Sequence, residues 1–162
     1  MNEQTKTFKY PTCFTTVDIV VYDKSTNQVL LGKKPKQNLH RFVGGFSDPK
    51  NDSFESDAVR ELMEETGLIA QTSDLLYLGT ARIDDERYKN TQDCIKTIFY
   101  LCPYVGGTPM ANDDIESVKW FNLSDLKVDD VVREHRVLFN LLQIWVKKNL
   151  TTNKQNKILL QG

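Results

Sequence analysis

The segment SFESDAVRELMEETGL, residues 53–68, constrains the fold more than any other part of the chain. Ser53 is a suitable N-cap and Gly67 suits the left-handed position that follows many helices, so a helix is predicted over residues 54–66. At about 100° per residue, this helix has one face that can pack on a sheet and one face of carboxylates. The expected packing face consists of Val59, Leu62, Met63 and Thr66. The expected acidic face consists of Asp57, Glu61, Glu64 and Glu65.

Four carboxylates on one helical face repel one another, at roughly a few tenths of a kcal/mol for each pair one turn apart. Arg60 lies one turn before Glu64 and is expected to hold that carboxylate in a fixed rotamer. The helix alone leaves two interpretations. The face is either a solvated acidic surface near a helix N-terminus, which the helix dipole tolerates, or a site for a hard cation such as Mg²⁺ or Mn²⁺.

The pair Gly44-Gly45 favours the cation site. It follows a predicted strand directly and precedes the loop that leads into the acidic helix. Glycine lets the backbone approach a ligand closely, so the carbonyl of Gly45 is a candidate metal ligand and free amides nearby suit a phosphate. Together, the glycine pair and the carboxylates predict a site for a metal ion and a phosphate-bearing ligand.

The rest of the chain predicts strands and one more helix in a mixed order. Strands are expected at residues 15–22, 28–31, 75–83, 95–101 and 118–121, the first two as a hairpin. A second helix is expected over 134–148, with a core stripe of Val137, Leu138, Leu141, Leu142, Ile144 and Trp145. His135 and Trp120 are expected to cap or pack.

Strands and helices do not alternate strictly along the chain, so the expected fold class is α/β with a mixed sheet covered by helices. The chain fits one domain, 1–162, with loose tails at 1–10 and 151–162.

Composition argues against several other classes of protein. The formal net charge is −1, so no global basic field predicts nucleic-acid binding, and an anionic substrate must be attracted by local groups. The polar N-terminus lacks the apolar core of a signal peptide, and no stretch is long and apolar enough to cross a membrane. Three cysteines without a C-x-x-C pair and two histidines argue against zinc and predict buried or neutral thiols in a reducing cytoplasm.

Residues 45–68 resemble a known family motif, the Nudix box, G-x5-E-x7-R-E-U-x-E-E-x-G-U, where U is a bulky aliphatic residue. Residues 60–68, RELMEETGL, match the second half of the box at every defined position. The first half departs, because Asp52 stands where the box has Glu, and six residues rather than five separate it from Gly45. In the family this position supports the loop, so the departure leaves the three later glutamates untouched.

The resemblance implies a Nudix-type α/β/α sandwich with a mixed sheet, in which the box forms a loop-helix-loop on one side. It also implies that Mg²⁺, with Mn²⁺ as the alternative, is bound by Gly45, Glu61, Glu64 and Glu65. Glu61 and Glu64 are the expected catalytic carboxylates, Glu61 also helping to activate water, and Arg60 orients the carboxylates. A general base outside the box is common in the family. The sequence does not choose among Asp113, Asp114 and Glu116, with Asp84, Asp85 and Glu86 behind them.

Two further segments, RFVGGFSDP and RIDDERYKNTQDCIKTIFY, resemble a subgroup that hydrolyses ADP-ribose, in which the domain can be fused to a nicotinamide mononucleotide adenylyltransferase. The subgroup's usual D-D-W-R-Y pattern has Glu86 in place of Trp here, so a stacking surface for adenine or ribose is expected to differ. Arg87 is expected to bind the terminal phosphate or ribose, and Tyr88 to stack or hydrogen-bond. Lys33 and Lys96 are candidates for phosphate contacts.

The leading functional hypothesis is Mg²⁺-dependent hydrolysis of a nucleoside diphosphate linked to another group, with ADP-ribose giving AMP and ribose 5-phosphate. One alternative is a Nudix pyrophosphatase for NADH, a nucleotide sugar or a nucleoside triphosphate. Another is a non-catalytic module that binds ADP-ribose as a sensor; such modules commonly carry a DNA-binding domain or have lost box glutamates. All three glutamates are present and the chain ends soon after the second predicted helix, which favours the enzyme. The family also makes a homodimer a reasonable expectation.

Overall fold

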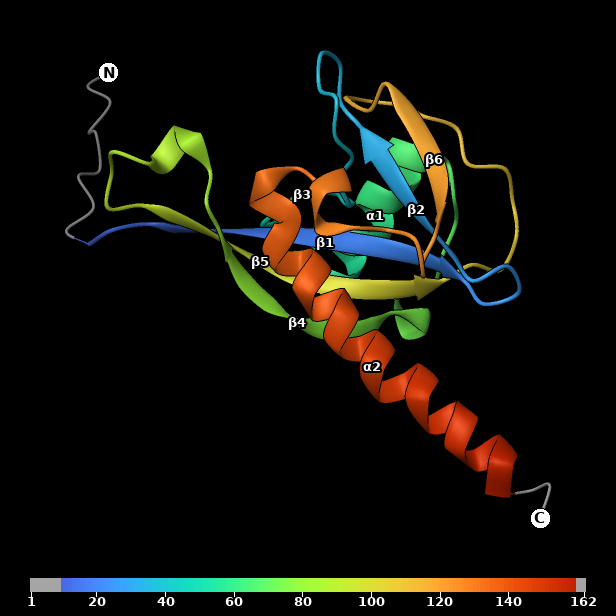
Figure 1. Ribbon diagram of the computed structural model, residues 1–162. Coiled ribbons are helices and arrows are strands. Elements are labelled where there is room, and N and C mark those ends of the chain that lie inside the picture. The colour runs from blue at the N-terminus through green and yellow to red at the C-terminus, as the bar shows by residue number, and fades with distance from the viewer. Residues whose placement is uncertain (1–9, 160–162) are drawn as a thin grey trace, which may run out of the picture.

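The computed structural model describes residues 10–159. Its strands form one six-stranded sheet, and the two α-helices lie on opposite faces of that sheet, α1 behind it and α2 in front of it in Figure 1. The strands are β1 (Cys13–Asp23), β2 (Gln28–Lys33), β3 (Val43–Phe46), β4 (Leu76–Ile83), β5 (Cys94–Pro103) and β6 (Ser117–Asn122). The helices are α1 (Phe54–Thr66) and α2 (Arg136–Leu159). Short 3-10 turns lie at Thr72–Asp74, Glu86–Tyr88, Val128–Asp130 and Arg133–His135.

The sheet is mixed, as the sequence predicts. Its strand order is β4-β5-β1-β2-β6, and β3 also pairs with β1. β1 runs parallel to β5 and antiparallel to β2 and β3. It is long enough to pair with β3 through residues 16–19 and with β2 through residues 21–23. This mixed sheet between two helices confirms the predicted fold class and the β1–β2 hairpin.

The central strand β1 contributes to a core on each face of the sheet, because successive side chains of a strand point to opposite faces. The core under α1 includes the buried residues Val17, Ile19, Val21, Ala58 and Leu62. The core under α2 includes Val20, Val29, Phe99, Leu138 and Leu142. By the same alternation, the one acidic residue inside the apolar run of β1, Asp18, falls on the α2 face.

Helix α1 has the predicted ends but a different packing face. The Ser53 side chain accepts a hydrogen bond from the backbone N–H of Ser56, and Gly67 has a φ of 69° with its N–H bonded to the carbonyl of Met63. The prediction that Met63 packs on the sheet is wrong, since it is 52% exposed. The helix instead buries Glu61 and Glu65 next to Leu62 and Thr66. The helix is therefore rotated so that two carboxylates face inward.

Helix α2 is longer than predicted. A 3-10 turn at residues 133–135 leads into it, and it continues to Leu159, whereas the sequence predicts a loose chain from Thr151. No glycine or proline occurs between the predicted end and Leu159, so nothing in the sequence stops the helix there. The predicted stripe is also narrower, since Ile144 is 50% exposed. The expected tail at 1–9 lies outside the described residues.

The three cysteines are free thiols in different surroundings. Cys102 is buried, and burial raises the pKa of its thiol to about 11, which keeps it neutral. Cys94 is half-buried. Cys13 is exposed, but desolvation and a hydrogen bond with Cys94 raise the pKa of its thiol, which agrees with the predicted buried or neutral thiols. Within residues 10–159, neither helix is long and apolar enough to span a lipid bilayer.

Candidate active site

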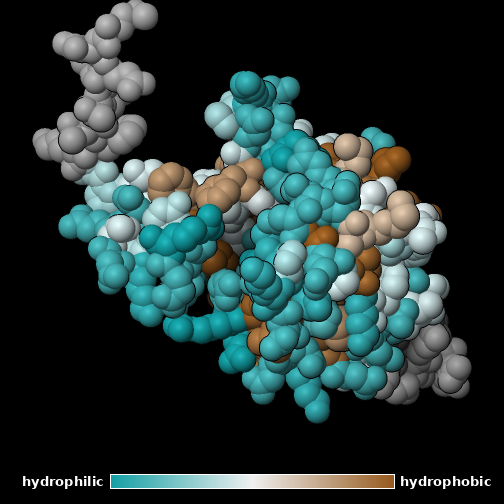
Figure 2. Space-filling model, turned by 90° about the horizontal axis from the view of Figure 1, so that it is seen from above, coloured by the Kyte–Doolittle hydropathy of each residue, from teal (hydrophilic) through white to brown (hydrophobic). Residues whose placement is uncertain are grey.

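A polar cavity of about 300 Å³ lies where β1, β3 and α1 meet three loops and the turn before α2. Its acidic lining consists of Asp18, Glu61, Glu65, Asp85, Asp113, Asp114 and Glu134. Its basic lining consists of Lys34, Arg41, Arg87 and His135. Viewed from above, the surface is largely hydrophilic, and a hollow separates the projecting lobe that carries the β4–β5 connection from the body of the molecule (Figure 2). The cavity therefore brings together charged residues from segments far apart in the sequence.

The glycine pair of β3 lies directly against the carboxylates of α1. The backbone N–H of Gly44 donates a hydrogen bond of 2.8 Å to the carboxylate of Glu65. A Cβ placed on Gly45 would lie 2.6–2.7 Å from the carboxylate atoms of Glu61, so only glycine fits there without displacing that group. Glu61 and Glu65 are only 8% and 2% exposed. These two carboxylates are thus buried beside a backbone turn and do not form a solvated acidic surface.

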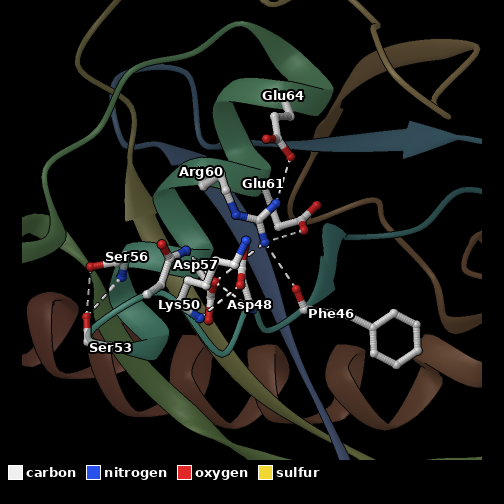
Figure 3. A network of polar contacts seen from close by, with 10 residues as sticks. Phe46, Asp48, Lys50, Ser53, Ser56, Asp57, Arg60, Glu61 and Glu64 are labelled. Carbon is white, nitrogen blue, oxygen red and sulfur yellow. Dashed lines mark hydrogen bonds and ion pairs between the residues drawn. The ribbon is translucent and has the colours of Figure 1, made fainter. Parts of the chain in front are cut away.

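Arg60 ties three parts of this corner together (Figure 3). Its Nη2 lies 2.8 Å from an oxygen of Glu61, and its Nη1 lies 2.8 Å from an oxygen of Glu64. Nη2 also donates to the carbonyl oxygen of Phe46 at the end of β3. These contacts are those expected of a residue that orients the carboxylates. Arg60 and the half-exposed Glu64 lie beside the cavity lining, whereas Glu61 and Glu65 are part of it.

The loop between β3 and α1 is held by Asp57, on the first turn of the helix. One oxygen of the buried Asp57 carboxylate accepts hydrogen bonds from the backbone N–H of Asp48 at 3.0 Å and from the side-chain amide of Asn51 at 2.7 Å. Nη2 of Arg60 lies 3.5 Å from the same oxygen. Asp52, at the position of the box glutamate, is exposed and makes no side-chain hydrogen bond or ion pair within residues 10–159. Asp57 therefore supports the loop, a role that the motif alone does not reveal.

Burial raises the pKa values of two carboxylates of α1, Glu61 and Glu65. Burial raises the pKa of Glu65 to about 8, and a hydrogen bond with Asp114 adds to the increase while the Gly44 N–H opposes it. Burial also raises the pKa of Glu61, against the opposing charge of Arg60. Burial acts to raise the pKa of Asp114 too, but hydrogen bonds with Lys34 and Glu65 and the charge of Lys34 bring it below its ordinary value. Glu65 is therefore the proton donor and Asp114 the acceptor in their hydrogen bond.

These residues fit a hard divalent cation by their chemistry. Carboxylate and carbonyl oxygens are the ligands that Mg²⁺ and Mn²⁺ take, and the corner supplies them from three glutamates and Gly45. A divalent charge there would also favour the ionised forms of Glu61 and Glu65, whose pKa values are raised mainly by burial. The carboxylates are not drawn together into a coordination shell: within residues 10–159, no three acidic, thiol or imidazole groups are arranged to hold a metal ion. Arg60 instead neutralises Glu61 and Glu64.

A second charged cluster faces the cavity from the loop after β2. Lys34 makes a close ion pair with Asp114. Nη2 of Arg41 lies 3.2 Å from Nε2 of His135, at the turn before α2. The sequence showed Lys34 within a basic loop but gave no reason to choose it or Arg41 over the lysines around them. Only the fold, which returns this loop to the glycine pair, distinguishes them.

A buried pair at the floor of the cavity was also missed as part of the site. The carboxylate of Asp18 accepts a 2.5 Å hydrogen bond from the hydroxyl of Thr97, and burial raises its pKa to about 6. Nδ1 of His135 accepts from the backbone N–H of Phe42, and its Nε2 lies 3.6 Å from Asp18. Burial lowers the pKa of His135 well below its ordinary value, so its ring is neutral. His135 packs as predicted, but it also lines the cavity.

Some of the candidate general bases line the cavity and the others form ion pairs outside it. Asp113, Asp114 and Asp85 line the cavity. Glu116 does not, and forms an ion pair of 3.1 Å with Lys33. Outside the cavity, Asp84 pairs with Arg133 at 2.6 Å and Glu86 pairs with Lys89 at 3.2 Å. The structure thus narrows the sequence-based candidates to three aspartates at the cavity.

Of the four residues predicted to contact the substrate, one lines the cavity and three do not. Arg87 lines the cavity. Tyr88 lies beside it and packs on Phe14, with ring centroids 5.1 Å apart. Lys33 and Lys96 are not in the cavity lining; Lys33 is paired with Glu116, and Lys96 is exposed on β5. Trp120 is partly buried in the core under α1, in keeping with its predicted packing role.

Comparison with known proteins agrees with this geometry. The family model described as NUDIX domain matches residues 14–142. The ADP-ribose pyrophosphatase of Methanocaldococcus jannaschii is 30% identical over 103 residues, which are 62% of this chain and 57% of that protein. A MutT/nudix family protein from Enterococcus faecalis is 30% identical with a TM-score of 0.58, covering 73% of this chain and 47% of its own. This chain therefore spans about half the length of these two relatives.

One solved structure covers nearly all of both chains. The NUDIX domain of Shewanella oneidensis NrtR, crystallised with ADP ribose, has a TM-score of 0.68 at 22% identity and covers 90% of this chain and 94% of its own. At this identity the likeness shows the fold. Nudix hydrolases generally use divalent metal ions, which agrees with the oxygen ligands found at the corner of α1 and β3. Since the family model spans most of the chain, and Gly45, Glu61 and Glu65 of the box line the cavity, this protein belongs to the Nudix hydrolase family.

Proposed function

We propose that this Nudix hydrolase cleaves the diphosphate of ADP-ribose, giving AMP and ribose 5-phosphate, with Mg²⁺ as the metal and Mn²⁺ as an alternative. The observation that carries the proposal is the division of charge in the cavity. Buried carboxylates of α1 form one side, and Lys34 and Arg41 contribute positive charge. A diphosphate needs cations on its oxygens, and the linked nucleoside and ribose need a cavity of this size. The relative from M. jannaschii and the ADP ribose-bound neighbour support this substrate.

We assign separate metal-binding, orienting and phosphate-binding roles to residues at the cavity. Glu61, Glu64, Glu65 and the carbonyl of Gly45 would hold the cation, and Arg60 keeps Glu61 and Glu64 in place. When bound, a divalent cation neutralises phosphate oxygens and lowers the pKa of water. Lys34 and Arg41 are placed to bind phosphate oxygens that the cation does not cover. Most of the rate enhancement then comes from positioning and charge stabilisation.

The proton released by the attacking water needs an acceptor at the cavity. Of the three candidate aspartates that line it, Asp85 is already held by two hydrogen bonds from the Arg87 guanidinium. Asp114 already bonds to Lys34 and Glu65, whereas Asp113 interacts with Glu61 only through its charge. A carboxylate without a fixed partner is the better proton acceptor, so we assign the base to Asp113.

A panel of diphosphates tests the substrate. ADP-ribose, NADH, a nucleotide sugar and a nucleoside triphosphate are each incubated with the full chain and Mg²⁺ or Mn²⁺, and the products are separated by chromatography. ADP-ribose is expected to give the highest kcat/KM, with AMP and ribose 5-phosphate in equal amounts. Turnover of ADP-ribose no faster than that of the other three would overturn the proposal.

Glu64→Gln separates an enzyme from a binding module. Glu64 is half-exposed and its neighbours on the helix remain, so the variant is expected to fold with an unchanged Tm. Turnover should be lost because a cation ligand is lost, while ADP-ribose still binds. If the unmodified protein binds ADP-ribose but hydrolyses it with neither metal, the sensor alternative is correct instead.

Two further expectations accompany the proposed reaction. A cytoplasmic location suits a nucleotide substrate, and we expect a homodimer in solution. Light scattering coupled to size-exclusion chromatography measures the oligomeric state directly, and a monomer at micromolar concentration would contradict the second expectation.

A further inference from the structure

On the basis of the proposed function, we propose that Arg87 and Phe46 form a stacking platform for the nucleobase of the substrate. Phe46 ends β3, directly after the glycine pair, and Arg87 lies in the connection between β4 and β5. Both line the cavity. The register pairs Gly44 with Asp18 and Phe46 with Thr16, so the platform lies two residues, about 7 Å, further along β1 than the buried acid.

The guanidinium of Arg87 is fixed in one plane. Its Nε donates to one carboxylate oxygen of Asp85 at 2.9 Å, and its Nη2 donates to the other oxygen at 2.8 Å. The backbone N–H of Arg87 also donates to Asp85, which fixes the turn that carries both residues. This bidentate contact uses the edge of the guanidinium that would otherwise grip a phosphate. The flat faces of the group are left for contact, and the side chain is 62% exposed.

Aromatic rings support that plane from below. The Cζ atom of Arg87 lies 5.4 Å from the ring centroid of Phe46 and 5.8 Å from that of Tyr88. Phe14 packs against both rings, with centroid distances of 6.5 Å to Phe46 and 5.1 Å to Tyr88. The carbonyl of Phe46 faces Arg60, and its ring points away from that network (Figure 3). The ring remains 42% exposed beside the cavity, although it is large and apolar.

The chemistry of these surfaces selects a base over the other parts of the substrate. Nucleobases stack on arginine planes and on aromatic rings, because both offer a flat polarisable face. Ribose and phosphate have no such face. Two apolar side chains, Ile83 and Ile95, line the same cavity, and Ile95 pairs with Phe14 across β1 and β5. The flat face of a nucleobase therefore has a complementary surface here. The charged diphosphate instead belongs beside Lys34, Arg41 and the proposed cation ligands.

The test measures binding of the two expected products to the full chain. AMP and ribose 5-phosphate both carry a phosphate and a ribose, and only AMP carries a base. Their dissociation constants are measured by calorimetry for the unmodified protein, Arg87→Lys and Phe46→Leu. Arg87→Lys keeps the charge and removes the plane, and Phe46→Leu keeps an apolar side chain and removes the ring. Each is expected to weaken AMP binding about tenfold and to leave ribose 5-phosphate binding unchanged.

Arg133→Lys is the matched control. Arg133 is another exposed arginine that pairs with an aspartate of the same connection, but it does not line the cavity. Its substitution should leave both dissociation constants unchanged. The platform is refuted if the unmodified protein binds AMP no more tightly than ribose 5-phosphate. It is also refuted if Arg87→Lys weakens both ligands equally, which identifies a phosphate contact, or weakens neither.

These outcomes are separate from those of the substrate panel. Base-dependent AMP binding that needs Arg87 and Phe46, in a protein that does not hydrolyse ADP-ribose, keeps the platform and rejects the proposed reaction. Rapid ADP-ribose hydrolysis by Arg87→Lys and Phe46→Leu, with unchanged AMP binding, keeps the reaction and rejects the platform.

Discussion

The corner between α1 and β3 and the connection between β4 and β5 are both rich in charge, but they use it differently. At the corner, the carboxylates of Asp57 and Glu65 are buried and bonded to backbone N–H groups of the β3–α1 loop and of β3. In the connection, the pairs of Asp84 with Arg133 and of Glu86 with Lys89 are exposed. Buried hydrogen-bonded charges fix geometry because breaking them leaves an unpaired polar group. Exposed pairs contribute little to stability and remain free to change.

The largest expected effect is that of Gly44→Ala at the corner. Gly44 has a φ of 149°, and a Cβ there would lie 2.1 Å from the carbonyl oxygen of Val17 on β1. Backbone on the central strand cannot move aside, so we expect a loss of stability of roughly 4 kcal/mol or more. Denaturant unfolding or the yield of soluble protein measures this. A variant as stable as the unmodified protein would show that the backbone of β1 can move to make room for a Cβ at residue 44.

Gly45→Ala, one residue later, is the matched substitution. The three atoms nearest to its Cβ would all belong to the carboxylate end of Glu61, which is a side chain and can move. We therefore expect the Tm to stay within a few degrees while kcat falls about a hundredfold, as for a catalytic group displaced by about 1 Å. Equal losses of stability in the two alanine variants would contradict this reading of the glycine pair.

Asp18→Asn tests a buried carboxyl group whose close partners, the Thr97 hydroxyl and the neutral His135 ring, carry no charge. The pKa of Asp18 is about 6 in the folded protein against an ordinary value of 3.8, so the folded state holds the proton more tightly. Its contribution is therefore most favourable below pH 3.8 and is lost as the pH rises to about 6. Relative to Asp18→Asn, the unmodified protein should lose about 2 kcal/mol between pH 4 and pH 7.5. A stability difference that is the same at both pH values would exclude this.

Asp57→Ala tests the anchor of the loop. Removing the carboxylate leaves the N–H of Asp48 and the amide of Asn51 without their partner, and we expect a loss of about 2 kcal/mol. Asp52→Ala is the control, with an expected change below about 0.5 kcal/mol because the side chain is exposed. Chemical denaturation of both variants measures the difference. If Asp52→Ala is the more damaging of the two, the usual box position still supports the loop.

The smallest effect is expected in the β4–β5 connection. Arg133→Ala removes an exposed pair with Asp84 and should cost less than about 1 kcal/mol. Raising the salt concentration should reduce even that difference, because exposed charges are screened. A loss comparable to that of Asp57→Ala would remove the contrast between the two regions.

The same contrast explains what the sequence predicts well. The ends of α1 follow from Ser53 and Gly67, whose capping roles depend only on local backbone geometry. The spacing of Glu61, Glu64 and Glu65 placed them on one helix beside the glycine pair. The rotation of that helix was not predictable, because burying Glu65 instead of Met63 depends on a hydrogen bond to Gly44 from a distant strand.

Residues from other segments were harder to find for a related reason. Asp18, Lys34, Arg41 and His135 become neighbours only when β1, the loop after β2 and the turn before α2 converge. The visible signal was one acid inside the apolar run TTVDIVVY. Lys33 and Lys34 differ by a single position, yet they pair with Glu116 and Asp114 respectively. No property of a lone sequence distinguishes which of two adjacent lysines faces inward.

The placement of Asp57 has a consequence for how this motif can vary. Its carboxylate belongs to the helix and reaches back over the preceding residues. The carboxylate that accepts these hydrogen bonds therefore moves with Arg60 and the glutamates whenever the helix moves. Its position on the helix does not depend on the number of residues in the preceding loop. Residues 49–52 are all exposed, so a change of loop length there disturbs no core packing. We expect neighbouring loop lengths to be tolerated where Asp48 and an amide side chain equivalent to Asn51 still reach Asp57.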